Sequence, residues 1–77
     1  MNIKVGDLVR IEYIDRNPAL ENFIKGNRIV CLVISEYDTY RFRIRPMFAE
    51  NDVGEMVLKG LGNKGFVYPK YSCELVE

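Results

Sequence analysis

Residues 27–46 read NRIVCLVISEYDTYRFRIRP, and this stretch decides the fold. The segment Arg28 to Ser35 is apolar on both faces and rich in β-branched residues, which favours a strand that is covered on both sides. A polar turn at 36–39 and a second strand, Tyr40 to Arg45, follow. We expect the two strands to pair antiparallel. We expect the ladder to end at Pro46, because proline has no N–H to donate.

The second strand of this hairpin alternates between apolar and basic residues. Successive side chains of a strand point to opposite faces, so one face carries the apolar set and the other the basic set. The apolar set is Tyr40, Phe42 and Ile44, and the basic set is Arg41, Arg43 and Arg45. The sequence therefore predicts a buried face and, opposite to it, a candidate binding surface.

Composition places the chain among small folded domains. Residues 1–77 are enough for a single domain, and 48% of them are hydrophobic. The 11 Lys and Arg balance the 11 Asp and Glu, so no overall charge draws the protein to nucleic acid or to an anionic membrane. The longest apolar run, Ile29 to Ile34, is too short for a membrane span, and the start of the chain lacks the pattern of a signal peptide. We therefore expect a cytoplasmic protein without a membrane partner.

A short helix is predicted in the long connection before the hairpin, at residues 15–26. Asn17 can cap a helix, Pro18 suits the first helical position and Gly26 suits the position just past the end. The face expected to pack on the sheet carries Leu20, Phe23 and Ile24. The alternative is an irregular loop with the same three residues turned inward.

Further strands are predicted on both sides of the hairpin. Residues 8–14 alternate, with Val9, Ile11 and Tyr13 on the apolar side. Downstream, short strands are expected at 55–58, 66–68 and 72–76. A connection at 47–54, with Asn51-Asp52 as its turn, and a glycine-rich hairpin loop at 60–65 join them. Five to six short antiparallel strands with one helix indicate a mainly β barrel or sandwich, and the length favours a barrel.

The chain resembles the small SH3-like β-barrel proteins that are common among short phage and bacterial proteins. The resemblance covers the opening VGDLVRI, the Ile- and Val-rich second strand, the pattern Y-x-F-x-I-x-P and the closing CELVE. It implies a single SH3-like barrel, a fold that hosts RNA binders, peptide binders and subunit contacts alike. The chain lacks the Trp and the acidic ligand loop of peptide-binding SH3 domains, so recognition of proline-rich peptides is not expected.

Residues that carry catalysis are scarce in the sequence. There is no histidine, which removes the commonest general base and metal ligand. The hydroxyls of Ser35, Thr39 and Ser72 stand in no nucleophile motif. The glycine-rich segment lacks the G-K-[ST] of a phosphate loop. An acid pair could be assembled from Glu12, Asp15, Glu36 or Asp38, but no spacing demands it. We expect no enzyme, no cofactor and no metal.

The two cysteines, Cys31 and Cys73, are expected to be reduced and packed in the interior. A single bridge is a poor framework for a secreted mini-domain, and Cys31 lies in an apolar strand. Their separation in the sequence fits no common zinc-binding spacing.

The candidate site is the row of three arginines. Guanidinium groups on alternate strand residues stand about 6.5–7 Å apart and suit carboxylates or phosphates. Candidate ligand-binding residues are Arg28, Tyr37, Tyr40, Arg41, Arg43 and Arg45, the tyrosines serving as stacking planes. The alternative is that the arginines only solubilise an exposed face or pair with Glu12, Glu36 or Glu55.

Three functions remain open from the sequence. The first is a non-catalytic binding module, of phage or bacterial origin, that docks an acidic protein partner or its own copies. The second is an oligomeric sponge that sequesters a phosphorylated small molecule or nucleotide against a defence system. The third is a weak binder of RNA or single-stranded DNA, which the neutral net charge disfavours.

Overall fold

The computed structural model describes residues 2–76. It consists of one five-stranded antiparallel sheet and two helices, so the expectation of a mainly β chain is confirmed. The elements in chain order are β1 (Leu8–Ile11), α1 (Pro18–Ile24), β2 (Ile29–Glu36), β3 (Arg41–Ala49), α2 (Asp52–Leu61), β4 (Phe66–Pro69), a single 3-10 turn η1 (Lys70–Ser72) and β5 (Glu74–Leu75).

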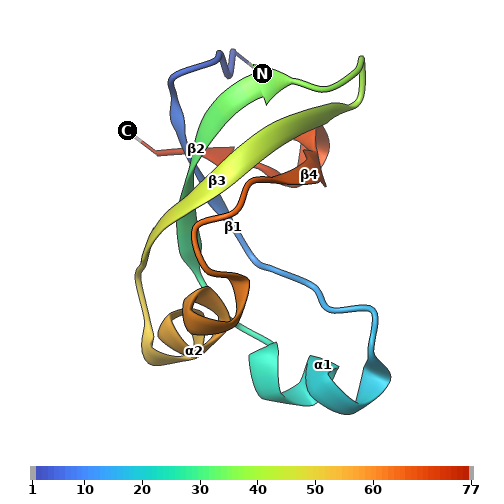
Figure 1. Ribbon diagram of the computed structural model, residues 1–77, viewed down its shortest axis with the longest axis vertical. Coiled ribbons are helices and arrows are strands. Elements are labelled where there is room, and N and C mark those ends of the chain that lie inside the picture. Colours follow the sequence, from blue (N-terminus) through green and yellow to red (C-terminus); the bar gives the residue numbers. More distant parts are fainter. Residues whose placement is uncertain (1, 77) are drawn as a thin grey trace.

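The strands lie in the order β4-β3-β2-β1-β5, so the first and last strands of the chain are neighbours. The sheet is open, and β4 and β5 form its two edges. Figure 1 shows that β2 and β3 are long and bent, with the β2–β3 turn at one end of the molecule and both helices at the other. The predicted hairpin is therefore the centre of the sheet.

Two irregularities in the β2–β3 register account for the bend. Register shifts occur between Val30 and Cys31 and between Val33 and Ser35, where an extra residue on one strand increases the local twist. Pro46 lies opposite Cys31, next to the first shift, and is buried. The prediction that this proline ends the ladder is wrong, because the bulge accommodates it and β3 continues to Ala49.

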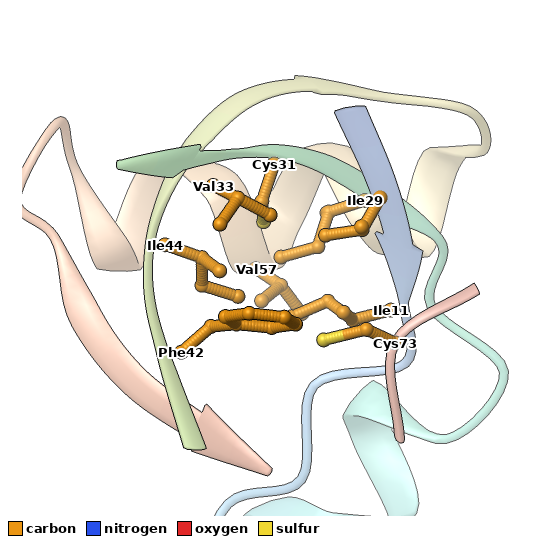
Figure 2. Packing of buried hydrophobic residues seen from close by; sticks show 9 residues of the cluster. Ile11, Ile29, Cys31, Val33, Phe42, Ile44, Val57 and Cys73 are labelled. Atoms are coloured by element: carbon orange, nitrogen blue, oxygen red, sulfur yellow. The ribbon is translucent and has the colours of Figure 1, made fainter. Parts of the chain in front are cut away.

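The core lies on the inner side of the curved sheet (Figure 2). Every strand except β4 and β5 supplies fully or nearly fully buried side chains, and α2 adds one. The buried cluster comprises Val9, Ile11, Ile29, Cys31, Val33, Phe42, Ile44, Val57 and Cys73. The predicted inward positions Phe42 and Ile44 are confirmed. Tyr40 is exposed instead, because β3 begins one residue later and Tyr40 belongs to the turn.

The helix predicted before the hairpin is present as α1. The Asn17 side chain accepts a hydrogen bond from the Ala19 N–H, and Pro18 begins the helix as expected. Of the three predicted packing residues only Ile24 contacts the core, whereas Leu20 and Phe23 are exposed. That part of the prediction is wrong, because α1 lies at the end of the sheet rather than on its face (Figure 1).

Asn27 fixes the connection between α1 and β2. Its side chain is fully buried and accepts a hydrogen bond from the Tyr13 N–H at 2.8 Å. Its amide nitrogen donates to the carbonyl oxygens of Tyr13 and Ile24. All three bonds are to backbone groups, and the Ile24 carbonyl oxygen also accepts from the Asn27 N–H. One amide side chain thus links the end of α1 to the segment after β1.

Residues 55–58 form part of helix α2, so the predicted strand at this position is wrong. Asn51, predicted as a turn residue, is the helix cap, and its Oδ1 accepts from the Gly54 N–H at 2.7 Å. Asp52 and Glu55 then stand in the first turn, where the helix dipole favours negative charge. The glycine-rich segment follows as the end of α2 and its link to β4, not as a hairpin loop.

Asn51 also ties the helix to the start of β2. Its Oδ1 accepts from the Arg28 N–H and its Nδ2 donates to the Gly26 carbonyl oxygen. Gly54 allows the close approach, since an added Cβ would lie 2.4 Å from the Arg28 carbonyl oxygen. Val57 on the same side of α2 reaches the core (Figure 2).

Within residues 2–76, none of the helices is both long enough and apolar enough to cross a membrane.

Candidate functional site

The three predicted arginines of β3 lie on the outer face of the sheet. Arg41, Arg43 and Arg45 are exposed, and they alternate with the buried residues Phe42 and Ile44. The outer face of β3 carries no helix, because α2 lies at the end of the sheet (Figure 1). The predicted division of this strand into a buried and a basic face is therefore observed.

Arg41 is engaged within its own turn. Its Nε and Nη2 donate to Asp38 Oδ2 at 2.9 and 2.5 Å, and its guanidinium carbon stands 4.9 Å from the centre of the Tyr37 ring. The hydrogen bond from Arg41 lowers the pKa of the Asp38 carboxyl below its ordinary value. Arg41 therefore stabilises the turn, and Asp38 neutralises its positive charge.

Arg43 and Arg45 differ from Arg41 in this respect. Neither has an ion-pair partner among residues 2–76. The Arg43 guanidinium carbon stands 5.6 Å from the Tyr37 ring centre, and Arg45 lies directly across from Leu32. The ring positions Arg43 without neutralising it. Two guanidinium groups on alternate residues are thus available to an anion.

Other cations of the sheet are occupied. Arg10 pairs with Glu50, and its Nη1 lies 3.5 Å from Glu74. Lys70 pairs with Glu36 and lies over the Phe42 ring. The predicted cross-strand partners Glu12, Glu36 and Glu55 make no ion pair with the β3 arginines. Arg28 is also exposed and has no ion-pair partner among residues 2–76. Arg43 and Arg45 are distinguished by their position on alternate residues of one strand, which puts two unpaired cations on the same face.

Apolar side chains continue the arginine row at both ends. Tyr37 is 50% exposed at the turn, and Met47 and Phe48 are 45% and 47% exposed beyond Arg45. Phe48 lies opposite Val30, whose side chain belongs to the outer face. We call Tyr37, Arg43, Arg45, Met47 and Phe48 the outer strip. The sequence prediction missed Met47 and Phe48 because it ended the strand at Pro46.

Two predicted site residues lie apart from the outer strip or at its margin. Tyr40 is exposed in the turn, where its N–H donates to Asp38. Arg28 is exposed at the start of β2 and lines a small polar depression of about 340 Å³ with Arg10, Ser72 and Glu74. The fold therefore joins Tyr37 to the β3 arginines. It places Arg28 beyond Phe48 at the other end of the outer strip, where the Glu50 N–H donates to the Arg28 carbonyl oxygen at 2.9 Å.

A second feature is a groove between the segment after β1 and the β4–η1 region. It has a volume of about 630 Å³, and its lining includes the aromatic side chains Tyr13, Phe66, Tyr68 and Tyr71. Phe66 meets both Tyr13 and Tyr68 edge to face, with ring centres 5.9 and 6.0 Å apart. Burial raises the pKa of the Tyr68 hydroxyl to about 12. Sequence patterns do not predict this groove, because residues 13–16, Leu61 and residues 66–72 meet there only in the folded chain.

The two cysteines are unpaired and buried, as expected. Burial raises the pKa of the Cys31 thiol to about 12 and that of Cys73 to about 11. Both are therefore thiols rather than thiolates at neutral pH. In the described part of the chain, His, Cys, Asp and Glu side chains form no group of three that could hold a metal ion.

Comparison with known proteins found no match: no family model, no curated protein and no solved structure is significantly similar to the chain.

Proposed function

We propose that the protein is a small non-catalytic interaction module that docks an acidic protein partner on the outer strip. The observation that carries the proposal is the pair Arg43 and Arg45, which is exposed and lacks an ion-pair partner within residues 2–76. Arg10, Arg41 and Lys70 are each paired by contrast. A partner's carboxylates would supply the missing counter-charges in bidentate geometry.

Docking of the chain's own copies through this face is less favoured. A two-fold interface sets the same patch of both copies together. With the axis passing between Arg43 and Arg45, these residues would face their counterparts of the other copy, and like charges repel. Self-association would need another surface of the second copy or an anion between the two. An acidic partner of another kind meets no such penalty.

The expected complex is weak and reversible. Charge-assisted hydrogen bonds contribute roughly 1.5–3 kcal/mol each, while association costs roughly 4–15 kcal/mol. Two arginines alone therefore leave little net affinity. The exposed Tyr37, Met47 and Phe48 add apolar area at both ends of the pair, and apolar burial supplies what the charges lack.

A second candidate function is capture of a phosphorylated small molecule or nucleotide by several copies, as in an anti-defence sponge. The same free guanidinium pair favours it, because phosphate accepts bidentate hydrogen bonds as carboxylate does. Weak binding of RNA or single-stranded DNA is the third candidate. A phage or bacterial origin and a cytoplasmic location belong to these proposals as well.

We also propose that the fold is an SH3-like barrel. It is supported by the strand order, in which β1 and β5 are neighbours, and by the curvature of β2 and β3. It is also supported by contacts between β4 and the segment after β1. The Tyr68 hydroxyl donates to the Glu12 carbonyl oxygen at 2.7 Å, and Tyr13 meets Phe66. These side-chain contacts connect β4 with the segment after β1, although β4 and β1 are not paired as strands.

Titration with short acidic peptides, followed by amide chemical shifts, tests the docking proposal. We expect shifts concentrated at residues 37–48 and lost in the double variant Arg43→Ala, Arg45→Ala. Arg16→Ala is the matched control, since this exposed arginine lies outside the outer strip. Shifts elsewhere, or shifts that persist in the double variant, would contradict the proposal. A shift pattern with inorganic pyrophosphate but not with peptides would favour the second candidate.

A further inference from the structure

The two ends of the outer strip are closed by carboxylates. At one end Asp38 holds Arg41 beside Tyr37. At the other end Glu50 follows shortly after Phe48 and holds Arg10, which lies across β2. Both carboxylates are already bonded to the nearest arginine. An anion that extends beyond the free pair would therefore have to displace Asp38 or Glu50 from its partner.

The spacing of the free pair suits an extended segment. Arg43 and Arg45 are alternate residues of β3, so their Cα atoms are about 6.5–7 Å apart. Alternate side chains of an extended partner have the same spacing and point the same way, whereas adjacent side chains point to opposite sides. Two carboxylates on alternate residues can therefore meet both arginines at once.

The residues on either side of the free pair favour apolar side chains of the partner. Tyr37 precedes the pair along the outer strip, and Met47 and Phe48 follow it, all about half exposed. A partner side chain that lies over either end is removed from water and contacts no free cation. A charge there would meet the ion pairs Arg41–Asp38 and Arg10–Glu50, in which the opposite charges cancel.

From this arrangement we infer the kind of partner, resting on the proposed function: an extended protein segment with acidic residues at two alternate positions and apolar residues on both sides. A continuous polyanion, such as a polyglutamate tract or a nucleic acid strand, fits less well. The reason is that Asp38 and Glu50 already neutralise Arg41 and Arg10, so β3 offers a polyanion only the two unpaired guanidinium groups of Arg43 and Arg45.

Fluorescence anisotropy with labelled peptides tests this inference. The probe is a seven-residue peptide with leucine at both ends, glutamate at the third and fifth positions and serine elsewhere. The matched control has the same composition with its glutamates at the third and fourth positions. We expect the alternating peptide to bind about tenfold more tightly, which corresponds to one charge-assisted hydrogen bond. Equal binding of the two peptides would overturn the inference and leave the proposed function standing.

Two polyanions complete the comparison: a seven-residue polyglutamate peptide and a short oligothymidylate. We expect both to bind more weakly than the alternating peptide at physiological salt. Tighter binding of either one would overturn the inference, and tight oligothymidylate binding would point to single-stranded nucleic acid. Failure of every peptide to bind would sink the proposed function itself.

The double variant Asp38→Asn, Glu50→Gln tests the stated cause. Both substitutions keep the side-chain size and remove the negative charge. We expect the variant to bind the polyanions more tightly than the unmodified protein, with the alternating peptide changed less. Unchanged polyanion binding, with the variant shown to be folded by its amide spectrum, would contradict the role of these carboxylates.

Discussion

The inner and outer faces of the β2–β3 hairpin differ in almost every property although they share the same backbone. On the inner face Cys31, Val33 and Ile44 are fully buried (Figure 2). On the outer face of the same strands Arg43 and Arg45 are exposed. One step along β3, from Ile44 to Arg43 or Arg45, thus changes the role of a residue from core to surface. Stability and recognition can therefore be altered independently in this hairpin.

Helix α2 shows the same contrast on a smaller scale. Gly54 and Val57 are buried, whereas Met56 next to Val57 is exposed and Gly60 faces open space. Pairs of identical substitutions, one at an inner and one at an outer position, test this difference.

The largest effect is expected for Ile44→Ala, with Ile34→Ala as its outer-face counterpart. Ile44 is fully buried and Ile34 is 37% exposed. Loss of a buried isoleucine side chain leaves a cavity, so Ile44→Ala should lower the free energy of unfolding by about 2–5 kcal/mol. Ile34→Ala should cost clearly less. Urea denaturation followed by circular dichroism measures both, and equal losses would refute the division of faces.

Two glycine-to-alanine substitutions in helix α2 are expected to change the free energy of unfolding in opposite directions. The Cβ of Gly54→Ala would meet the Arg28 carbonyl oxygen, so this variant should lose about 1–3 kcal/mol as overpacked sites do. Gly60→Ala lies in the same helix with nothing nearby and should gain roughly 0.5–1 kcal/mol from helix propensity. Thermal denaturation compares the two. A stabilised Gly54→Ala protein would mean that α2 does not dock as described.

The buried thiols predict a loss of stability at alkaline pH. Burial raises the pKa of Cys31 to about 12 and of Cys73 to about 11, above the ordinary value of 9.0. Because the folded state holds the thiol protons more tightly, their contribution is complete below pH 9 and is lost as the pH rises toward 11–12. At pH 10 the expected loss is about 1 kcal/mol per thiol.

Denaturation midpoints at pH 8 and pH 10 measure this loss. The double variant Cys31→Ala, Cys73→Ala should be less stable overall but less sensitive to pH. Burial, the main cause of the raised pKa of Tyr68, is present in both proteins, but Cys73 and Cys31 raise that pKa further. The difference between the two proteins therefore reports the thiols together with their effect on Tyr68. An identical pH dependence would show that the thiols titrate as exposed groups do.

The smallest effect on stability is expected on the outer strip. Arg43→Ala and Arg45→Ala remove exposed side chains without ion-pair partners in the described part of the chain, so each should change the free energy of unfolding by no more than about 0.5 kcal/mol. Urea denaturation checks this. A larger loss would make either arginine a structural residue and would weaken the proposed function.

The sequence predicted the parts of the fold whose periodicity is strong. The alternation of β3 and the β-branched run of β2 placed the central hairpin, and Asn17 with Pro18 placed α1. Residues 55–58 were wrongly predicted as a strand. The segment is only four residues long, EMVL, and it fits the periodicity of a strand as well as that of a helix. The Asn51 cap, which settles the helix, resembles a turn residue in the sequence.

The candidate site was predicted only in part for a related reason. Strand alternation is enough to set Arg41, Arg43 and Arg45 on one face. It does not tell which of them is neutralised, because the partner of Arg41 depends on how the turn closes around Asp38. It also does not place Phe48 on that face, because the bulge beside Pro46 is a tertiary adjustment.

The sequence by itself therefore determined the composition of each face: an apolar inner row, a basic outer row and a neutral whole. Alternation is a local property of the extended backbone and can be read without knowing the neighbours. Only the tertiary structure decided that Arg43 and Arg45 remain unpaired while Arg41 and Arg10 are held by Asp38 and Glu50. Ion pairing depends on distances between separate elements, and these are fixed when the sheet bends and α2 docks.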